Sequence, residues 1–179
     1  MKIIFTLLLL PLLLLPLSSG ICGDIEVGKP APDFTLDFAT KDTIIGDGFT
    51  LSKEIGKSVI ILAFYPADWS GGCTKEMCTM RDNFGELSEL NAAVYGISGD
   101  YPYSHKAWAK EHNLPFALLS DNMHNVATMY NSFHSESGYT KRTVFVIDMK
   151  GTIVYADLQY STRDVTSFEK LQEALRTIR

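Results

Sequence analysis

The fold of this chain is decided by residues 58–78, whose sequence is SVIILAFYPADWSGGCTKEMC. Residues 58–64 are almost entirely apolar and rich in β-branched side chains, which is the pattern of a strand covered on both faces of its sheet. The segment from Pro66 to a Gly-Gly pair indicates a loop, because proline and glycine interrupt regular structure. A helical pattern begins at Cys73. The stretch therefore predicts a buried strand that delivers a thiol to the start of a helix.

The rest of the chain alternates short apolar strands with helical patterns. Strands are predicted at 34–38, 49–52, 92–98 and 116–120, and a hairpin is predicted at 143–155. Helices are predicted at 73–90, 104–112, 125–130 and 167–178. Because residues 34–38 alternate apolar and polar side chains, they are expected to form a half-buried edge strand. Strands that alternate with helices, followed by a hairpin and a last helix, predict an α/β fold in three layers.

Length and charge restrict the classes of function. The chain has 179 residues, of which 46% are hydrophobic, so it can bury one sizeable core. Its net charge of -5 disfavours binding to nucleic acid or to anionic lipid, since both attract basic surfaces. The spacing of the three cysteines and four histidines suggests neither a disulfide scaffold nor a metal site. Three of the histidines are expected on helices or helix edges, facing solvent.

The N-terminus has the three regions of a secretory signal. Lys2 precedes the leucine-rich stretch 3–17, which small residues follow as far as Gly20. The stretch is short for a transmembrane helix and contains two prolines, which disfavours an uncleaved anchor. We therefore expect a signal peptide at 1–20 and one folded domain at 21–179. The expected destination lies on a secretory route: a periplasm, the extracellular space, an endomembrane lumen or an organelle reached through it, without stable membrane association after cleavage.

Residues 66–73 have the spacing Pro-x-x-x-Ser-x-x-Cys. This spacing resembles the signature of the peroxiredoxins. The C-x4-C pair and the run Gly-Cys-Thr-Lys-Glu resemble the Q-type branch, the bacterioferritin comigratory proteins, which are atypical 2-Cys peroxiredoxins. Further matches follow in order at 96–100, 114–121 and 142–148, so that the resemblance extends from Gly28 to the C-terminus. It implies a thioredoxin-like three-layer sandwich with a central mixed sheet and an N-terminal extension.

The resemblance also implies a function. It is that of a thiol-dependent peroxidase for hydrogen peroxide and organic hydroperoxides, in which Cys73 becomes a sulfenic acid and Cys78 resolves it as an intramolecular disulfide. The resemblance implies that thioredoxin or a similar dithiol protein regenerates the thiols. It implies no metal, haem, flavin or other cofactor. It also implies a monomer, since Q-type relatives are often monomers. Two alternatives stay open: a thioredoxin-like disulfide reductase, although such enzymes use C-x2-C, and a non-catalytic redox sensor.

Arg142 is the residue expected to activate Cys73. A free thiol with a pKa near 8.5 is only about 3% thiolate at pH 7, so the nucleophile needs a positive environment. The start of a helix supplies a modest part of it, and a guanidinium supplies more because it keeps its proton. Arg142 stands at the start of a predicted central strand and matches the active-site arginine of the family. Its alternative interpretation is a solvated arginine at a strand end.

Four further residues around the thiol are candidates for the site. Ser70 could place its hydroxyl at the leaving oxygen of a peroxide, or merely cap the helix. Pro66 could shield the sulfur, or merely break the loop. Glu76 matches a family position that helps to orient the arginine, but it could also be an exposed helix residue. Trp69 could line the peroxide entrance or cover the loop.

The spacing of Cys73 and Cys78 predicts motion. Five residues of ideal helix separate two Cα atoms by about 8.5 Å and turn their side chains about 140° apart. A disulfide needs Cα atoms within about 7 Å, so the first turns of the helix must unwind in each cycle. In the alternative, Cys78 is a buried helical thiol and an outside thiol reduces Cys73. Cys22 is a poorer partner because it stands in a terminal tail.

Overall fold

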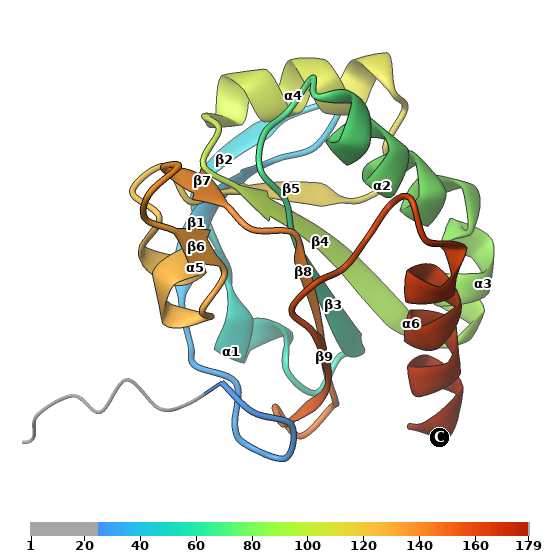
Figure 1. The fold of residues 1–179 in the computed structure, drawn as a ribbon. Helices are drawn as coiled ribbons and strands as arrows, with labels where there is room; N and C mark the ends of the chain where they lie inside the picture. Colours follow the sequence, from blue (N-terminus) through green and yellow to red (C-terminus); the bar gives the residue numbers. More distant parts are fainter. Residues whose placement is uncertain (1–24, 179) are drawn as a thin grey trace, which may run out of the picture.

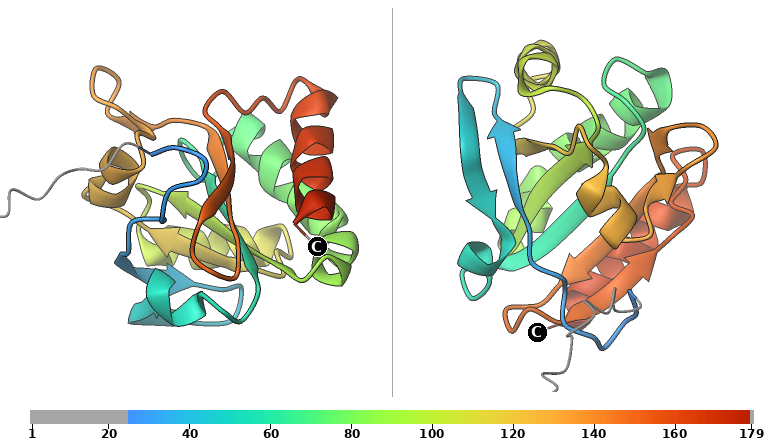
Figure 2. Two further views of the ribbon diagram at one scale, coloured as in Figure 1. Left: turned by 90° about the horizontal axis from the view of Figure 1, so that it is seen from below. Right: turned by 90° about the vertical axis from the view of Figure 1, so that its left-hand side faces the viewer.

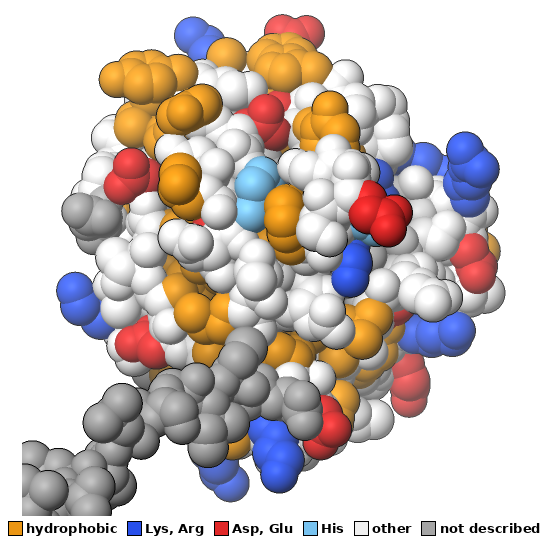
Figure 3. Space-filling model, turned by 60° about the vertical axis from the view of Figure 1, so that its left-hand side comes forward, with side chains coloured by type: hydrophobic (Ala, Val, Ile, Leu, Met, Phe, Trp, Pro, Cys, Tyr) orange, Lys and Arg blue, Asp and Glu red, His pale blue; other side chains and the backbone are white. Residues whose placement is uncertain are grey.

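The structure, a computed structural model, describes residues 25–178. The signal peptide predicted at 1–20 and Cys22 lie outside the described residues. Within them, every helix is too short or too polar to cross a bilayer. On the face that Figure 3 shows, basic and acidic side chains are scattered among polar and apolar ones. This mixture agrees with the absence of a strongly basic composition in the sequence.

Seven strands form one mixed sheet in the centre of the molecule (Figure 1). From one edge to the other they are β2 (Ile44–Thr50), β1 (Thr35–Ala39), β5 (Ala117–Ser120), β4 (Ala92–Ser98), β3 (Val59–Phe64), β8 (Thr143–Ile147) and β9 (Ile153–Asp157). β4 pairs in parallel with β3 and with β5, and the other neighbouring pairs are antiparallel. Every residue of β3 is buried, as the apolar pattern of 58–64 predicts, and every residue of β8 is buried as well.

Helices cover both faces of this sheet. One face packs against α2 (Gly71–Asp82), α3 (Phe84–Glu89), α4 (Pro102–Glu111) and α6 (Val165–Thr177). The other face packs against α1 (Leu51–Glu54) and α5 (Asn125–Met129). The two faces therefore carry separate apolar cores, and Cys73 belongs to the core under α2. The expected three-layer α/β sandwich with a central mixed sheet is confirmed.

Two details of the sheet correct the sequence analysis. The strand predicted at 34–38 is not at the edge, because β1 lies between β2 and β5 (Figure 2). The edge strand β2 begins at Ile44, in a stretch whose glycines lower strand propensity and so hide the strand pattern. The strand expected at 49–52 ends at Thr50, and α1 begins at the next residue.

The helix predicted at 73–90 is also different. It begins two residues earlier, at Gly71, and it breaks at Asn83, which separates α2 from α3. The side-chain amide of Asn83 donates to the Thr79 carbonyl and so stabilises the end of α2. A small hairpin of β6 (Phe133–His134) and β7 (Tyr139–Thr140) was not predicted. Because this hairpin ends two residues before Arg142, it leads the chain to the site.

The N-terminal extension runs along the β8–β9 hairpin. The Gly28 amide donates to the Ile153 carbonyl, and the Ile153 amide donates to the Lys29 carbonyl, at 2.7 and 2.9 Å. The Ala31 amide donates to the Gly151 carbonyl at 2.8 Å. These bonds join the described start of the chain to the far edge of the sheet, as the blue and orange segments in Figure 1 show.

Candidate active site

Cys73 lies in the first turn of α2. Ser70 is the N-cap of this helix, and its hydroxyl oxygen accepts a hydrogen bond from the Cys73 amide at 3.4 Å. The Ser70 carbonyl accepts from the Thr74 amide at 2.9 Å. The Cys73 side chain is fully buried against the core. The sulfur therefore stands at the positive end of a helix of twelve residues, where negative charge is stabilised.

Arg142 reaches the same sulfur from the start of β8. Its Nη2 lies 3.3 Å from the Cys73 Sγ, and its Nη1 donates to a carboxylate oxygen of Glu76. The guanidinium thus bridges the thiol and the carboxylate, two side chains of one helix. A Cβ atom on Gly72 would lie 3.2 Å from Nη2, so a glycine at this position leaves room for the guanidinium. Arg142 is therefore not the solvated strand-end residue of the alternative interpretation.

Glu76 is buried, which excludes its interpretation as an exposed helix residue. Burial raises the pKa of Glu76 to about 7, although the nearby charge of Arg142 acts in the opposite direction. Burial also opposes the charge on Arg142, but Glu76 and Cys73 outweigh it and hold the pKa of Arg142 above its ordinary value. The arginine consequently stays charged beside the thiol, while the carboxyl group can change its protonation near neutral pH.

A cavity of about 270 Å³ borders Glu76 between α2 and α6. Its lining combines polar residues of α2 and the C-cap of that helix with residues of the loop before α6 and of the first turns of α6: Lys75, Glu76, Thr79, Asn83, Tyr160, Ser161, Thr162, Asp164, Val165, Phe168, Glu169 and Gln172. The Oε1 atom of Glu76 is buried and accepts no hydrogen bond from the described residues. An unpaired buried oxygen favours the neutral acid, in agreement with the raised pKa of Glu76.

Cys78 lies further along α2 and is half-buried, and both described cysteines are free thiols. The helix is continuous from Gly71 to Asp82, so it holds the two thiols apart. No group of three or more His, Cys, Asp and Glu side chains within residues 25–178 is arranged to hold a metal ion.

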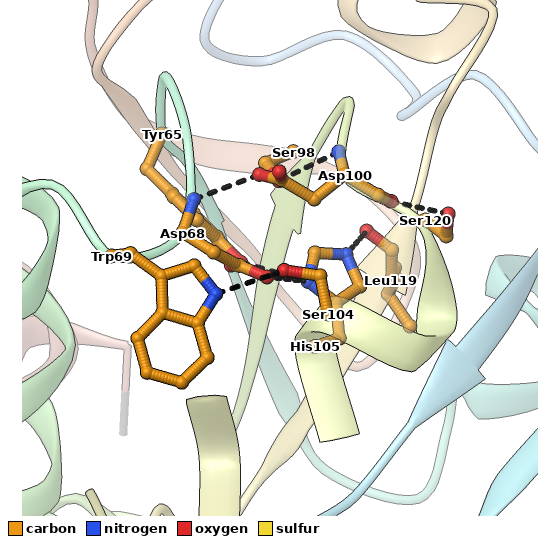
Figure 4. Close-up of polar contacts among 9 residues, drawn as sticks. All are labelled: Tyr65, Asp68, Trp69, Ser98, Asp100, Ser104, His105, Leu119 and Ser120. Atoms are coloured by element: carbon orange, nitrogen blue, oxygen red, sulfur yellow. Dashed lines mark hydrogen bonds and ion pairs between the residues drawn. The ribbon is translucent and has the colours of Figure 1, made fainter. Parts of the chain in front are cut away.

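Pro66 and Trp69 lie in the loop between β3 and α2. Pro66 is half-buried and follows Tyr65, whose amide donates to the Ile97 carbonyl at 3.0 Å. Trp69 is 56% exposed, and its indole N–H donates to the Ser104 hydroxyl at 3.1 Å. Figure 4 shows the indole directed toward α4. The position of Trp69 thus agrees with a covering role on the loop, and its role at a peroxide entrance stays a prediction.

His105 is the residue that the sequence analysis most clearly missed. It was expected to be among histidines that face solvent, but it is fully buried and lies 3.0 Å from a carboxylate oxygen of Asp68. The signal was present in the helical spacing, because Trp108 and Ala109 follow it by three and four residues and share its buried face. Trp108 itself packs α4 against the sheet, as its apolar surroundings indicate.

These features define a thioredoxin-like protein with an arginine-paired thiol at a helix start, and comparison identifies the family. Residues 27–156 match the AhpC/TSA family, and the chain belongs to it. The chain is 34% identical over 161 residues to peroxiredoxin Bcp of Bacillus subtilis, a match that covers 87% of this chain and 96% of that protein. It is 41% identical over 140 residues to chloroplastic peroxiredoxin Q of Triticum aestivum, covering 77% of this chain. The expected resemblance to Q-type peroxiredoxins is confirmed.

The solved structures include a similar fold. The crystal structure of peroxidoxin BcpB from Mycobacterium tuberculosis superposes with a TM-score of 0.74 at 29% identity, covering 87% of this chain and 99% of that one. The chain spans only 62% of the length of the wheat relative.

The expectation of a secretory route is wrong. The wheat relative is named as a chloroplastic protein, and the name of the Bacillus subtilis relative carries no secretory destination. The leucine-rich segment that suggested this route lies outside the described residues. Its apolar pattern alone was therefore an insufficient basis for a destination.

Proposed function

We propose that this protein is a thiol-dependent peroxidase that reduces hydrogen peroxide and organic hydroperoxides. The observation that carries the proposal is the 3.3 Å contact between the Arg142 guanidinium and the Cys73 sulfur at the start of α2. A cation and a helix terminus beside one buried sulfur favour the thiolate, which is the nucleophilic form. Membership of the AhpC/TSA family supports the same activity.

In the first step the Cys73 thiolate attacks the terminal oxygen of the peroxide. A sulfur–oxygen bond forms, the oxygen–oxygen bond breaks, and the second oxygen leaves as alcohol or water after it takes up a proton. The sulfur is oxidised to a sulfenic acid and the peroxide is reduced. Arg142 donates to the charge that develops on oxygen. Because the Ser70 oxygen accepts from the Cys73 amide, its hydroxyl hydrogen remains free to donate to the same oxygen.

In the second step the Cys78 thiol attacks the sulfenic sulfur. A disulfide forms between Cys73 and Cys78, and the hydroxyl of the sulfenic acid leaves as water. Since α2 is continuous through both residues, its first turns must open for this step. A dithiol protein of the thioredoxin type then reduces the disulfide and becomes oxidised itself.

The remaining assignments complete the proposal. Pro66 shields the sulfur from bulk water, and Glu76 orients Arg142 by accepting a hydrogen bond from its guanidinium. The domain that carries the activity is residues 21–179, and it acts as a monomer without a bound cofactor. Sedimentation of the reduced protein tests the oligomeric state, and a concentration-dependent rise in mass would contradict a monomer. We do not favour the disulfide reductase or the redox sensor, since the Arg142–Cys73 pair serves peroxide cleavage.

The decisive experiment measures peroxide consumption with thioredoxin. Cys73→Ser is expected to lose all activity, whereas Cys78→Ser is expected to consume one equivalent of peroxide and then stop. Cys22→Ser is the matched control and is expected to behave as the wild type. Insulin reduction without peroxide consumption would support the reductase instead. Persistent peroxide turnover in Cys73→Ser would overturn the assignment of the site.

A further inference from the structure

Asp68, in the loop between β3 and α2, is held from three directions (Figure 4). Its carboxylate accepts from the Tyr65 hydroxyl and from the Ser104 hydroxyl, each at 2.8 Å. Its amide donates to a carboxylate oxygen of Asp100 at 2.8 Å. The side chains of Asp68 and His105 are inaccessible to solvent. The loop is therefore joined at its midpoint to β3, to the loop after β4 and to α4.

His105 completes this network through its contact with Asp68. Its Nε2 lies 3.2 Å from the Leu119 carbonyl oxygen, which only accepts, so Nε2 carries a hydrogen. Its Nδ1 lies 3.0 and 3.2 Å from the two oxygens of Asp68. The Tyr65 hydroxyl lies 3.4 Å from the same nitrogen. Every polar side-chain atom of Asp68 and His105 therefore has a hydrogen-bond partner in this buried site.

Tyr65 and Asp100 support the same arrangement. Burial and the nearby Asp68 carboxylate hold the pKa of Tyr65 well above its ordinary value, so the phenol keeps the hydrogen that it donates. Asp100 accepts from the Ser98 hydroxyl at 2.8 Å, and its own carbonyl accepts from Ser120 at 2.5 Å. Asp100, whose carboxylate accepts from the Asp68 amide, is thus held in place by the last residues of β4 and β5.

The network continues toward the thiol through Trp69. This residue has a φ of 62°, a left-handed conformation that costs a non-glycine residue energy. Its indole donates to Ser104, which in turn donates to Asp68. The next residue, Ser70, caps α2 and accepts from the Cys73 amide. Because Trp69 and Ser70 directly follow Asp68 in the chain, a displacement of Asp68 would also move Ser70, the cap that holds the Cys73 amide.

We propose that Asp68 and His105 are positioning residues, a buried clamp that holds the loop before α2 and so places Cys73 and Ser70 for the reaction. Neither residue touches the sulfur. The clamp anchors the chain up to Trp69, so that the opening of α2 begins beyond it and the loop returns to one position after each cycle. The predicted effect of the clamp on the reaction rate rests on the proposed peroxidase activity. Its predicted effect on the order of the loop does not depend on that activity.

The test compares Asp68→Ala, Asp68→Asn and a control, Ile153→Ala, which opens a cavity in the core on the opposite face of the sheet. The rate of Cys73 oxidation by one equivalent of hydrogen peroxide is measured well below each melting temperature. Asp68→Ala is expected to lose about a hundredfold in rate, since a displacement of about 1 Å has this effect. Asp68→Asn is expected to stay within about tenfold of wild type, because its amide can donate to a neutral His105 and its oxygen can accept from Tyr65.

Amide exchange at Cys73 and Thr74 provides a second measurement that needs no peroxide. Exchange is expected to be faster in Asp68→Ala than in Ile153→Ala. If Asp68→Ala does not fold, Ser104→Ala, a half-buried position, replaces it and is expected to lose about tenfold in rate. A wild-type rate and unchanged exchange in the folded variant, or an equal loss in Ile153→Ala, would overturn the clamp. If the wild-type protein does not consume peroxide, the proposed function is overturned. The comparison of amide exchange in Asp68→Ala and Ile153→Ala would then test the clamp by itself.

Discussion

Replacement of Glu76 by glutamine tests the electrostatics of the site most directly. Glu76 is buried, and burial raises its pKa from 4.5 to about 7 although the charge of Arg142 lowers it. A glutamine has nearly the same shape and keeps an oxygen that can accept from Arg142, but it cannot ionise. The substitution therefore removes a titrating group while it preserves the packing of α2.

The magnitude follows from the two pKa values. Their difference, 7 − 4.5, is about 2.5 units, which corresponds to about 3 kcal/mol at about 1.4 kcal/mol per unit. Because the pKa is higher in the folded protein than in the unfolded chain, folding binds the proton more tightly. This contribution to stability is fully present below about pH 4.5 and is lost as the pH rises through about 7. Between about pH 5 and pH 8, wild type should lose about 2–3 kcal/mol relative to Glu76→Gln.

The assay is urea unfolding of both proteins across this pH range, with the free energy of unfolding extrapolated to water. Glu86→Gln is the control, because Glu86 forms a surface ion pair with Arg176 and its loss should change the free energy by at most about 1 kcal/mol. Parallel curves for wild type and Glu76→Gln would refute the reasoning, since they would mean that Glu76 has the same proton affinity in both states.

Three further predictions concern the thiol and its helix. Arg142→Lys should lower the rate of Cys73 oxidation by about 10- to 100-fold. An ammonium cannot bridge the sulfur and Glu76 as the guanidinium does. An unchanged oxidation rate in stopped-flow measurements would show that this bridge has no function. Gly72→Ala should also slow the oxidation of Cys73, because the new Cβ would lie 3.2 Å from Nη2 of Arg142 and displace the guanidinium. The melting temperature of this variant should hardly change. Gly71→Ala is the control, since a Cβ at that position meets open space. Amide exchange across residues 72–81 should be faster in the oxidised protein than in the reduced one, and equal protection would contradict the opening of α2.

Local patterns in the sequence predicted the central part of the fold. The unbroken apolar run before Tyr65 indicates a strand covered on both faces, and β3 is buried throughout. The spacing of glycines, Ser70 and Cys73 indicates the start of a helix, although α2 begins two residues before the predicted position because Ser70 is its cap. These features depend on neighbours within a few residues, and short-range patterns report such neighbours well.

Contacts between distant segments were predicted only in part. The pairing of Arg142 with Cys73, 69 positions away, was expected from the family resemblance rather than from any pattern in the residues. The place of β1 inside the sheet and the bond between His105 and Asp68, 37 positions apart, were not expected. Each depends on which strands and helices become neighbours, and short-range patterns carry no record of this.

The sequence by itself thus determined that a cysteine follows a buried strand at the start of a helix, because strand, loop and cap are all local properties of residues 58–78. The tertiary structure decided how that cysteine is surrounded. It brings β8 beside β3, which carries Arg142 to the sulfur, and it packs α4 against β5, which buries His105 against Asp68. The sequence was therefore enough to identify the Cys73 sulfur as the reactive atom. Its activation and its positioning arise from packing between segments far apart in sequence.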